Sequence, residues 1–254
     1  MGTDTAGYGA ELHSDGWQGV VSYARHPQAE KDFWRLVNAA IGAGARRICD
    51  IGGGARPTLP LERVAEGGLE YVVIDESAEE LEESAGYERE HASVLDRARI
   101  RAIAQERGPF DLVVSRWTAE HIRDGRRFHE SVHDLLRPGG TAVHMCSTLY
   151  ALPFLINRAL PDALTRSLLF GVCRGREEKF RPYYSWCRGP SARQLRRLER
   201  TGFAIRFYGG YFGHGFYRPV PPLHWLHDKV CDLLVRHPLA GPTSFAVIAL
   251  ERDG

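Results

Sequence analysis

The feature that most constrains the fold is a regular alternation of short apolar runs with helical segments through the middle of the chain. Apolar runs at 46–51, 69–77 and 110–115 are each followed by a segment whose apolar residues recur at helical spacing. Strands that alternate with helices need crossover connections, which pair the strands in parallel. The alternation therefore predicts an α/β fold with a doubly wound, Rossmann-like sheet and right-handed crossovers.

Composition narrows the class of protein. A chain of 254 residues with this pattern is expected to form one domain. Its formal net charge of +1 gives no basic field for a nucleic acid, and no apolar run is long enough to span a membrane, so neither partner is predicted. Five widely spaced cysteines without a C-x-x-C pair indicate reduced thiols and a cytoplasmic protein. The preference for arginine over lysine favours a bacterial source.

Three glycines, Gly52, Gly53 and Gly54, directly follow the first apolar run. In a parallel sheet, ligands bind beyond the carboxyl ends of the strands, and glycine lets the backbone approach them closely. A P-loop is excluded because no lysine stands at the required spacing, and a dinucleotide fingerprint is weak because Pro57 replaces its third glycine. What remains is a glycine turn preceded by Asp50, with a second acid, Asp75, ending the next strand.

Four motifs, "CDIGGG", "VVIDES", "FDLVVSRWTAEHI" and "LLRPGG", follow one another in an order and spacing that resemble the class I S-adenosylmethionine-dependent methyltransferases of the small-molecule type. The resemblance implies a seven-stranded sheet with an antiparallel last strand, S-adenosylmethionine as the cofactor, and methylation of a small organic acceptor, such as a bacterial secondary metabolite, on oxygen or nitrogen. The alternatives are an NAD(P)-dependent oxidoreductase and a cofactor-binding protein without turnover.

The resemblance also implies the cofactor site. Asp50 is expected near the amino group of the methionine part and Asp75 at the ribose hydroxyls, since a carboxylate only accepts hydrogen bonds. Arg56 replaces a frequent glycine of the family and is a candidate for the cofactor's carboxylate. Either Ser93 or Asp96 is expected beside the adenine, although Asp96 could equally be a helix N-cap. The full predicted set is Asp50, Gly52, Gly53, Gly54, Arg56, Asp75, Glu76, Ser93, Val94, Asp96, Ser115, Arg116 and Trp117.

The segment "SRWTAEHI" is expected to lead from the cofactor toward the acceptor. Glu120 and His121 are adjacent and therefore face different ways, and His121 is either a pocket residue or a histidine bonded within the fold. No metal is predicted, because Trp117 replaces the first acid of an E-x-x-E-H site. His129 and His133 lack a third ligand and are expected on a solvated helix face. The predicted catalytic and pocket contacts are His121, His13, Tyr183 and Tyr184.

The single domain 1–254 is expected to comprise four parts: an N-terminal helical and lid segment at 1–44, a cofactor-binding core at 45–146, a helical lid insertion at 147–190 and the C-terminal part of the sheet at 191–254. The protein is expected to be a monomer or a homodimer.

Overall fold

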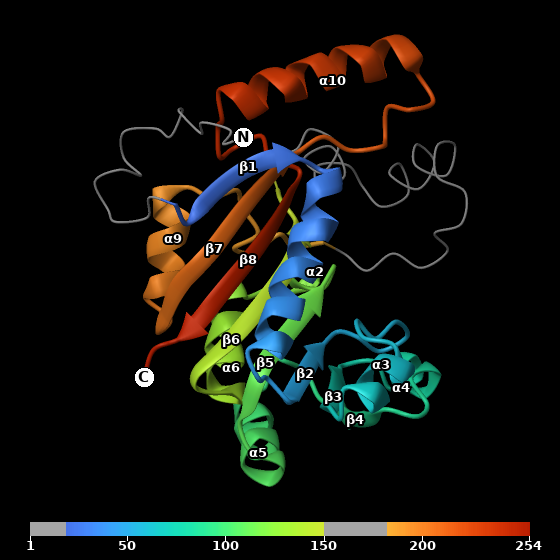
Figure 1. Cartoon of the computed structure of the whole chain (residues 1–254), viewed down its shortest axis with the longest axis vertical. Coiled ribbons are helices and arrows are strands. Elements are labelled where there is room, and N and C mark those ends of the chain that lie inside the picture. The colour runs from blue at the N-terminus through green and yellow to red at the C-terminus, as the bar shows by residue number, and fades with distance from the viewer. Residues whose placement is uncertain (1–18, 150–181) are drawn as a thin grey trace.

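An eight-stranded sheet organises the described part of the chain, which the computed structural model gives as residues 19–149 and 182–254 (Figure 1). Its strand order is β1-β7-β8-β6-β5-β2-β3-β4. The strands are β1 (Val21–Arg25), β2 (Arg47–Ile51), β3 (Glu70–Asp75), β4 (Glu88–His91), β5 (Phe110–Arg116), β6 (Leu136–Ser147), β7 (Phe203–Phe212) and β8 (Phe245–Arg252). Neighbours pair in parallel except around β8, which is antiparallel to both β6 and β7. The predicted Rossmann-like fold with an antiparallel last strand is confirmed.

One strand more than predicted is present, because β1 adds to the edge of the sheet beside β7. Val21 pairs with Tyr208, and the ring of Tyr23 stacks on Phe212 with centroids 5.8 Å apart. The segment expected to be helical at 1–44 therefore contains a strand before its helix. Residues 1–18, with the predicted contact His13, lie outside the described residues.

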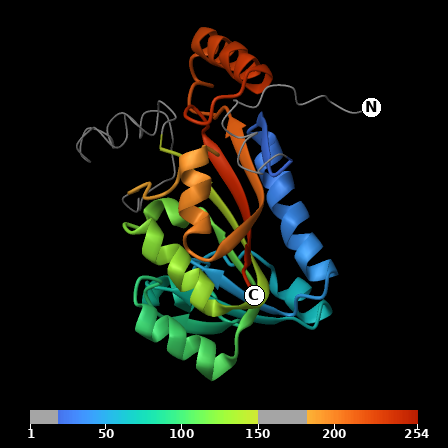
Figure 2. The ribbon, with the colours of Figure 1, turned by 90° about the vertical axis from the view of Figure 1, so that its left-hand side faces the viewer.

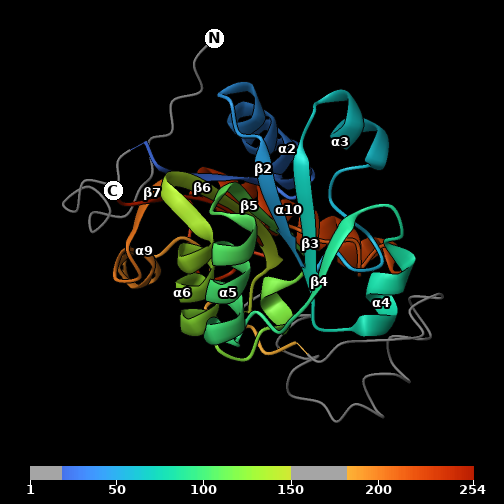
Figure 3. The same cartoon turned by 90° about the horizontal axis from the view of Figure 1, so that it is seen from below.

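Helices cover both faces of the sheet. They are α2 (Pro27–Gly42), α3 (Leu61–Glu66), α4 (Ala78–Glu83), α5 (Arg97–Arg107), α6 (Gly125–Leu135), α9 (Ala192–Glu199) and α10 (Pro221–Arg236), with a short 3-10 turn, η1 (Ala119–His121). Helix α2 lies on one face, and α5, α6 and α9 lie on the other (Figures 2 and 3). None of the helices in the described parts of the chain combines the length and apolar character needed to cross a membrane.

Local sequence signals explain where several helices begin. The side chains of Ser77, Asp96, Asp124 and Ser191 each accept a hydrogen bond from a backbone N–H in the first turn of the helix that follows. Helix α2 instead begins with a proline, whose fixed φ suits the first helical position. The N-cap interpretation of Asp96 is thus correct.

Packing joins the helices to the sheet through fully buried apolar side chains. Phe33 and Val37 of α2 pack on one face, and Phe128 and Val132 of α6 pack on the other. Because β7 and β6 are both antiparallel to β8, they run in the same direction as β2, β3 and β5, and all end at one edge. We call this edge the carboxyl edge. Of the lid predicted at 147–190, residues 150–181 lie outside the described residues.

Candidate functional site

The glycine turn after β2 is the centre of the carboxyl edge. Gly52 has φ +74°, which favours glycine, and its N–H donates to the carbonyl of Ile74 in β3 at 2.8 Å. A Cβ on Gly52 would overlap the side chain of Thr118, which follows β5. The ends of β2, β3 and β5 therefore meet at a point where only a hydrogen fits.

Asp50 fixes this turn from inside the protein. Its carboxylate is buried and accepts hydrogen bonds from the Tyr71 hydroxyl at 2.6 Å, the Thr58 N–H at 2.7 Å and the Thr58 hydroxyl at 3.1 Å. Burial raises the pKa of Asp50, while these hydrogen bonds oppose the rise. A Cβ on Gly53 would collide with the same carboxylate. Sequence reasoning missed both Thr58 and Tyr71.

Asp75 ends β3 beside the turn. Its Oδ2 accepts from the Gly54 N–H at 3.1 Å and its Oδ1 from the Ser77 N–H at 2.9 Å. A carboxylate has about four lone-pair sites, so acceptor capacity remains for further donors such as sugar hydroxyls. The next residue, Glu76, is exposed and accepts from the Ser93 hydroxyl at 3.2 Å.

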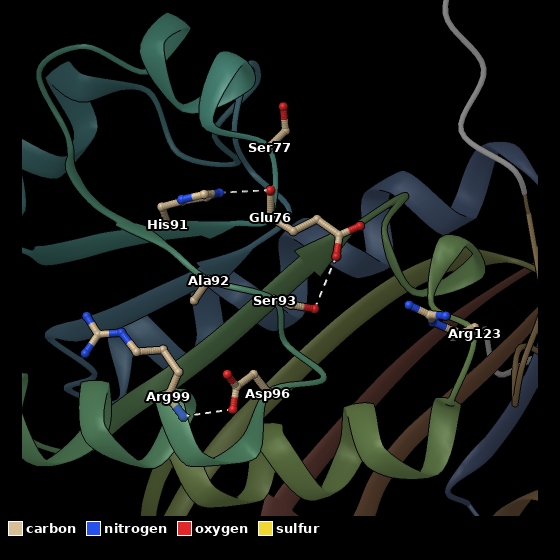
Figure 4. A pocket seen from close by; sticks show the side chains of 8 residues that line it. All are labelled: Glu76, Ser77, His91, Ala92, Ser93, Asp96, Arg99 and Arg123. Atoms are coloured by element: carbon tan, nitrogen blue, oxygen red, sulfur yellow. Dashed lines mark hydrogen bonds between the residues drawn. The ribbon is translucent and has the colours of Figure 1, made fainter.

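A cavity of about 690 Å³ opens next to Asp75 (Figure 4). It lies between the residues that follow β3 and β4 and the start of α5. Ser93 and Asp96 both line it, so the alternative between them stays open, although Asp96 also accepts from the N–H groups of Ala98 and Arg99. The lining residues are Glu76, Ser77, His91, Ala92, Ser93, Asp96, Arg99 and Arg123. The place of His91 at the end of β4 was a signal that could have identified it.

Three predicted residues at the end of β5 do not converge on the glycine turn. The Ser115 hydroxyl is buried and lies 2.8 Å from Nδ1 of His144, and Arg116 pairs with Glu30 of α2 at 3.4 Å. Trp117, with φ +61°, places its ring edge-on to Phe245. Thr118, which was not predicted, is the residue of this segment that contacts Gly52.

Arg56 and Val94 are two further predicted residues that lie outside the cavity lining. Arg56 is exposed in the loop after the glycines, and its N–H donates to the Gly53 carbonyl at 3.0 Å. Val94 is buried in the core. Neither side chain lines the cavity.

Glu120 is the buried member of the Glu120–His121 pair. Its Oε1 accepts from the N–H and hydroxyl of Ser147 at 3.2 and 2.9 Å. Its carbonyl accepts from the N–H groups of Tyr183 and Tyr184 at 2.8 and 2.9 Å. Burial raises the pKa of the Glu120 carboxyl, and His121 opposes the rise. Glu120 thus joins the end of β6 to the chain at 183–184.

The two predicted tyrosines have different surroundings. The Tyr183 side chain is 41% exposed, whereas Tyr184 is buried in the apolar core and has φ +51°. His121 is half-buried in η1 at the carboxyl edge.

One prediction for this region is wrong. His129 was expected on a solvated helix face, but it is buried between His144 and Trp186, with ring centroids 5.5 and 5.9 Å away. Burial and the neighbouring His144 hold the pKa of His129 well below its usual value. Burial also lowers the pKa of His144, to about 3. Helix α6 turns His129 inward because it shares the buried stripe with Gly125 and Val132, at i−4 and i+3.

Comparison with known proteins agrees with this geometry. Residues 49–142 match the family model of the methyltransferase domain. An "Uncharacterized methyltransferase" of Mycolicibacterium gilvum (strain PYR-GCK) is 30% identical over 125 residues, 48% of this chain and 47% of the relative. The chain therefore spans about half the length of this curated relative.

Solved structures show the same fold. An S-adenosylmethionine-dependent methyltransferase of Mesorhizobium loti has a TM-score of 0.50 and 18% identity, covering 88% of this chain and 98% of that one. A SAM-dependent methyltransferase of Archaeoglobus fulgidus has a TM-score of 0.50 and 16% identity, covering 88% and 94%. Residues 49–142 therefore match a methyltransferase domain, and the chain has the fold of class I S-adenosylmethionine-dependent methyltransferases, a class whose cofactor is S-adenosylmethionine.

The buried histidine pair predicts a pH-dependent stability. The pKa of His144 is lower in the folded protein than in the unfolded chain, so the unfolded chain binds more protons below about pH 6.5. Stability is therefore lost as the pH falls from 6.5 toward 3. Replacing His144→Asn removes this titration and keeps a polar partner for Ser115. Between pH 6.5 and 4, we expect the free energy of unfolding to fall by about 3 kcal/mol less in the variant than in the wild type.

Urea unfolding at several pH values measures this difference. Groups that do not contact His144 titrate in both proteins and cancel in the comparison. Removal of His144 also relieves part of the lowering of the pKa of His129, which changes the profile in the same direction. Parallel pH profiles of the two proteins would show that His144 does not titrate in this way.

Proposed function

We propose that this protein is an S-adenosylmethionine-dependent methyltransferase that acts on a small organic molecule, on oxygen or nitrogen. The observation that carries the proposal is that the Asp75 carboxylate is bonded to the glycine turn and is followed directly by Glu76 and Ser77, which line the cavity at the carboxyl edge of the sheet. This edge is where α/β folds bind their ligands. Free, buried cysteines among the described residues support a reducing compartment, and we place the reaction in the cytoplasm.

The residues present fit the cofactor. The turn at 52–54 consists of backbone alone and packs tightly against Thr118, Asp50 and Asp75, and such a turn lets a ligand approach the backbone closely. Asp75 keeps acceptor capacity for two ribose hydroxyls, and the polar cavity beside it suits the adenosine part. We assign Gly52, Gly53, Gly54, Asp75, Glu76 and Ser93 to cofactor binding. Asp50 is assigned to holding the turn, because three hydrogen bonds from Thr58 and Tyr71 occupy its carboxylate.

Methyl transfer places modest demands on the protein. When bound, S-adenosylmethionine supplies an electrophilic methyl group on a sulfonium sulfur. The task of the protein residues is to hold the acceptor in line and to exclude water. A base is needed only for an acceptor that is neutral at working pH, and we propose His121 for this role. We propose Tyr183 as a polar contact for the acceptor. Its side chain is exposed, and its backbone N–H donates to the carbonyl of Glu120 in η1.

Removal of the Asp75 charge tests the cofactor site. We expect Asp75→Asn to weaken S-adenosylmethionine binding by about 1.5 to 3 kcal/mol, since hydrogen bonds to a charged group are lost. Isothermal titration calorimetry measures the affinity. Glu79→Gln is a matched control, because it makes the same charge change on the exposed face of α4. Equal affinity of the Asp75 variant and the wild type would remove Asp75 from the site.

The same titration separates the enzyme classes. The proposal expects heat of binding with S-adenosylmethionine and none with NAD at the same concentration. Binding of NAD alone would instead support the oxidoreductase alternative.

Gly52→Ala tests the turn itself. The new Cβ would overlap Thr118, so we expect loss of cofactor binding by at least about tenfold, with a folded core. Gly68→Ala is the matched control: its φ is +55°, and a Cβ there has no heavy atom within 4 Å. It carries the strain of a positive φ without the overlap. Circular dichroism checks that both variants fold, and unaltered binding by Gly52→Ala would make the turn purely structural.

A further inference from the structure

Exposed apolar side chains gather on α10 and its flanks. Among the described residues, seven of the ten exposed large apolar side chains lie between 220 and 239, and they are 42% to 63% exposed. The members are Val220, Leu223, Trp225, Leu226, Val230, Leu233 and Leu239. A contiguous exposed apolar surface on a protein of this kind marks an interaction site.

Four of these residues form a stripe along one side of the helix. Leu223, Leu226, Val230 and Leu233 follow one another at steps of three, four and three, so they share one face of α10. We call this face the outer stripe. Cys231, which is buried, lies on the opposite side, toward the protein. The stripe therefore faces away from the body of the molecule.

Charges on α10 are divided in the same way. Its two acids are held by Arg25 at the end of β1: Asp228 at 2.5 Å and Asp232 at 2.6 Å. The exposed Lys229 lies over the Trp225 ring at 5.9 Å, and neither it nor the exposed Arg236 forms an ion pair with another described residue. The solvent side of α10 thus combines an apolar stripe with a tryptophan and two cations.

Helix α10 also has a distinctive place in the fold. It packs on β1 and β7 beyond the carboxyl edge and stands apart from the rest of the molecule (Figures 1 and 2). The candidate site lies at the same edge of the sheet.

Size argues against a second copy of the chain as the occupant. A 16-residue helix is about 24 Å long, and one face about 12 Å wide presents about 300 Å². Stable protein interfaces bury roughly 800 Å² on each partner. Binding to a lipid surface requires no such minimum buried area. A lipid surface favours a helix with an apolar face, a tryptophan and flanking cations.

We propose that the outer stripe of α10 docks the protein on an anionic lipid bilayer. Leu223, Leu226, Val230 and Leu233 enter the boundary between headgroups and acyl chains, while Lys229 and Arg236 contact anionic headgroups. The helix lies in the plane of the interface and does not cross it, as its length and its charges require. The sequence expectation of no membrane partner rested on the lack of a spanning stretch, which interfacial docking does not need.

Flotation with vesicles tests the proposal on the full chain. We expect the wild type to float with vesicles of 60% phosphatidylcholine and 40% phosphatidylglycerol, and to bind pure phosphatidylcholine at least tenfold more weakly. The double variant Leu226→Ser/Leu233→Ser should lose at least tenfold in binding to the anionic vesicles. Leu61→Ser, at an exposed leucine of α3, is the matched control and should bind as the wild type does.

The cationic flank is tested separately. Lys229→Glu/Arg236→Glu should abolish the preference for phosphatidylglycerol and the sensitivity of binding to salt. Thermal unfolding should be unchanged in all these variants because the altered side chains are exposed. Failure of the wild type to float, or equal flotation of the stripe variant, would overturn the proposal. So would a concentration-dependent dimer in analytical ultracentrifugation that the stripe variant abolishes, since the occupant would then be a second copy.

Discussion

A single buried carboxylate, that of Asp50, fixes the turn on which the candidate site is built. Taking a charged group out of water is costly unless hydrogen bonds replace its hydration, and here Thr58 and Tyr71 supply three. These bonds join β2, β3 and the loop between them. The loop that follows the glycines is therefore held by the core through Thr58 and Tyr71.

The sequence was sufficient to predict where Gly52 and Asp75 lie in the fold, because their positions depend on local structure. Gly52 follows β2 and Asp75 ends β3, two strands with clear apolar runs, and parallel strands bring their carboxyl ends together. Thr118 and Tyr71 could not be found in this way, because each acts through a contact between strands that depends on register. Ser115 shows the same limit: it lies in the right strand, but its hydroxyl is directed to His144 in the core.

Two other differences between the structure and the sequence-based predictions, at β1 and at His129, have separate causes. Strand β1 is short and half-buried. It pairs with β7, which lies far away in the sequence, so no local sequence pattern predicts it. His129 was accessible to prediction. Its position on the apolar stripe of α6 was a stronger signal than the polar character of imidazole, because a neutral histidine can be buried when its pKa falls.

The antiparallel strand β8 is central to the arrangement of β7 and β1 in the second half of the sheet. Strand β8 lies between β6 and β7 and is antiparallel to both, so β6 and β7 run in the same direction. The end of β7, and with it the end of β1, then lies at the carboxyl edge. Arg25 at the end of β1 binds the acids of α10, which turns the negative charges of that helix inward and leaves its leucines and cations outside. The same topology that assembles the cofactor half of the edge thus also positions α10 beyond its other half.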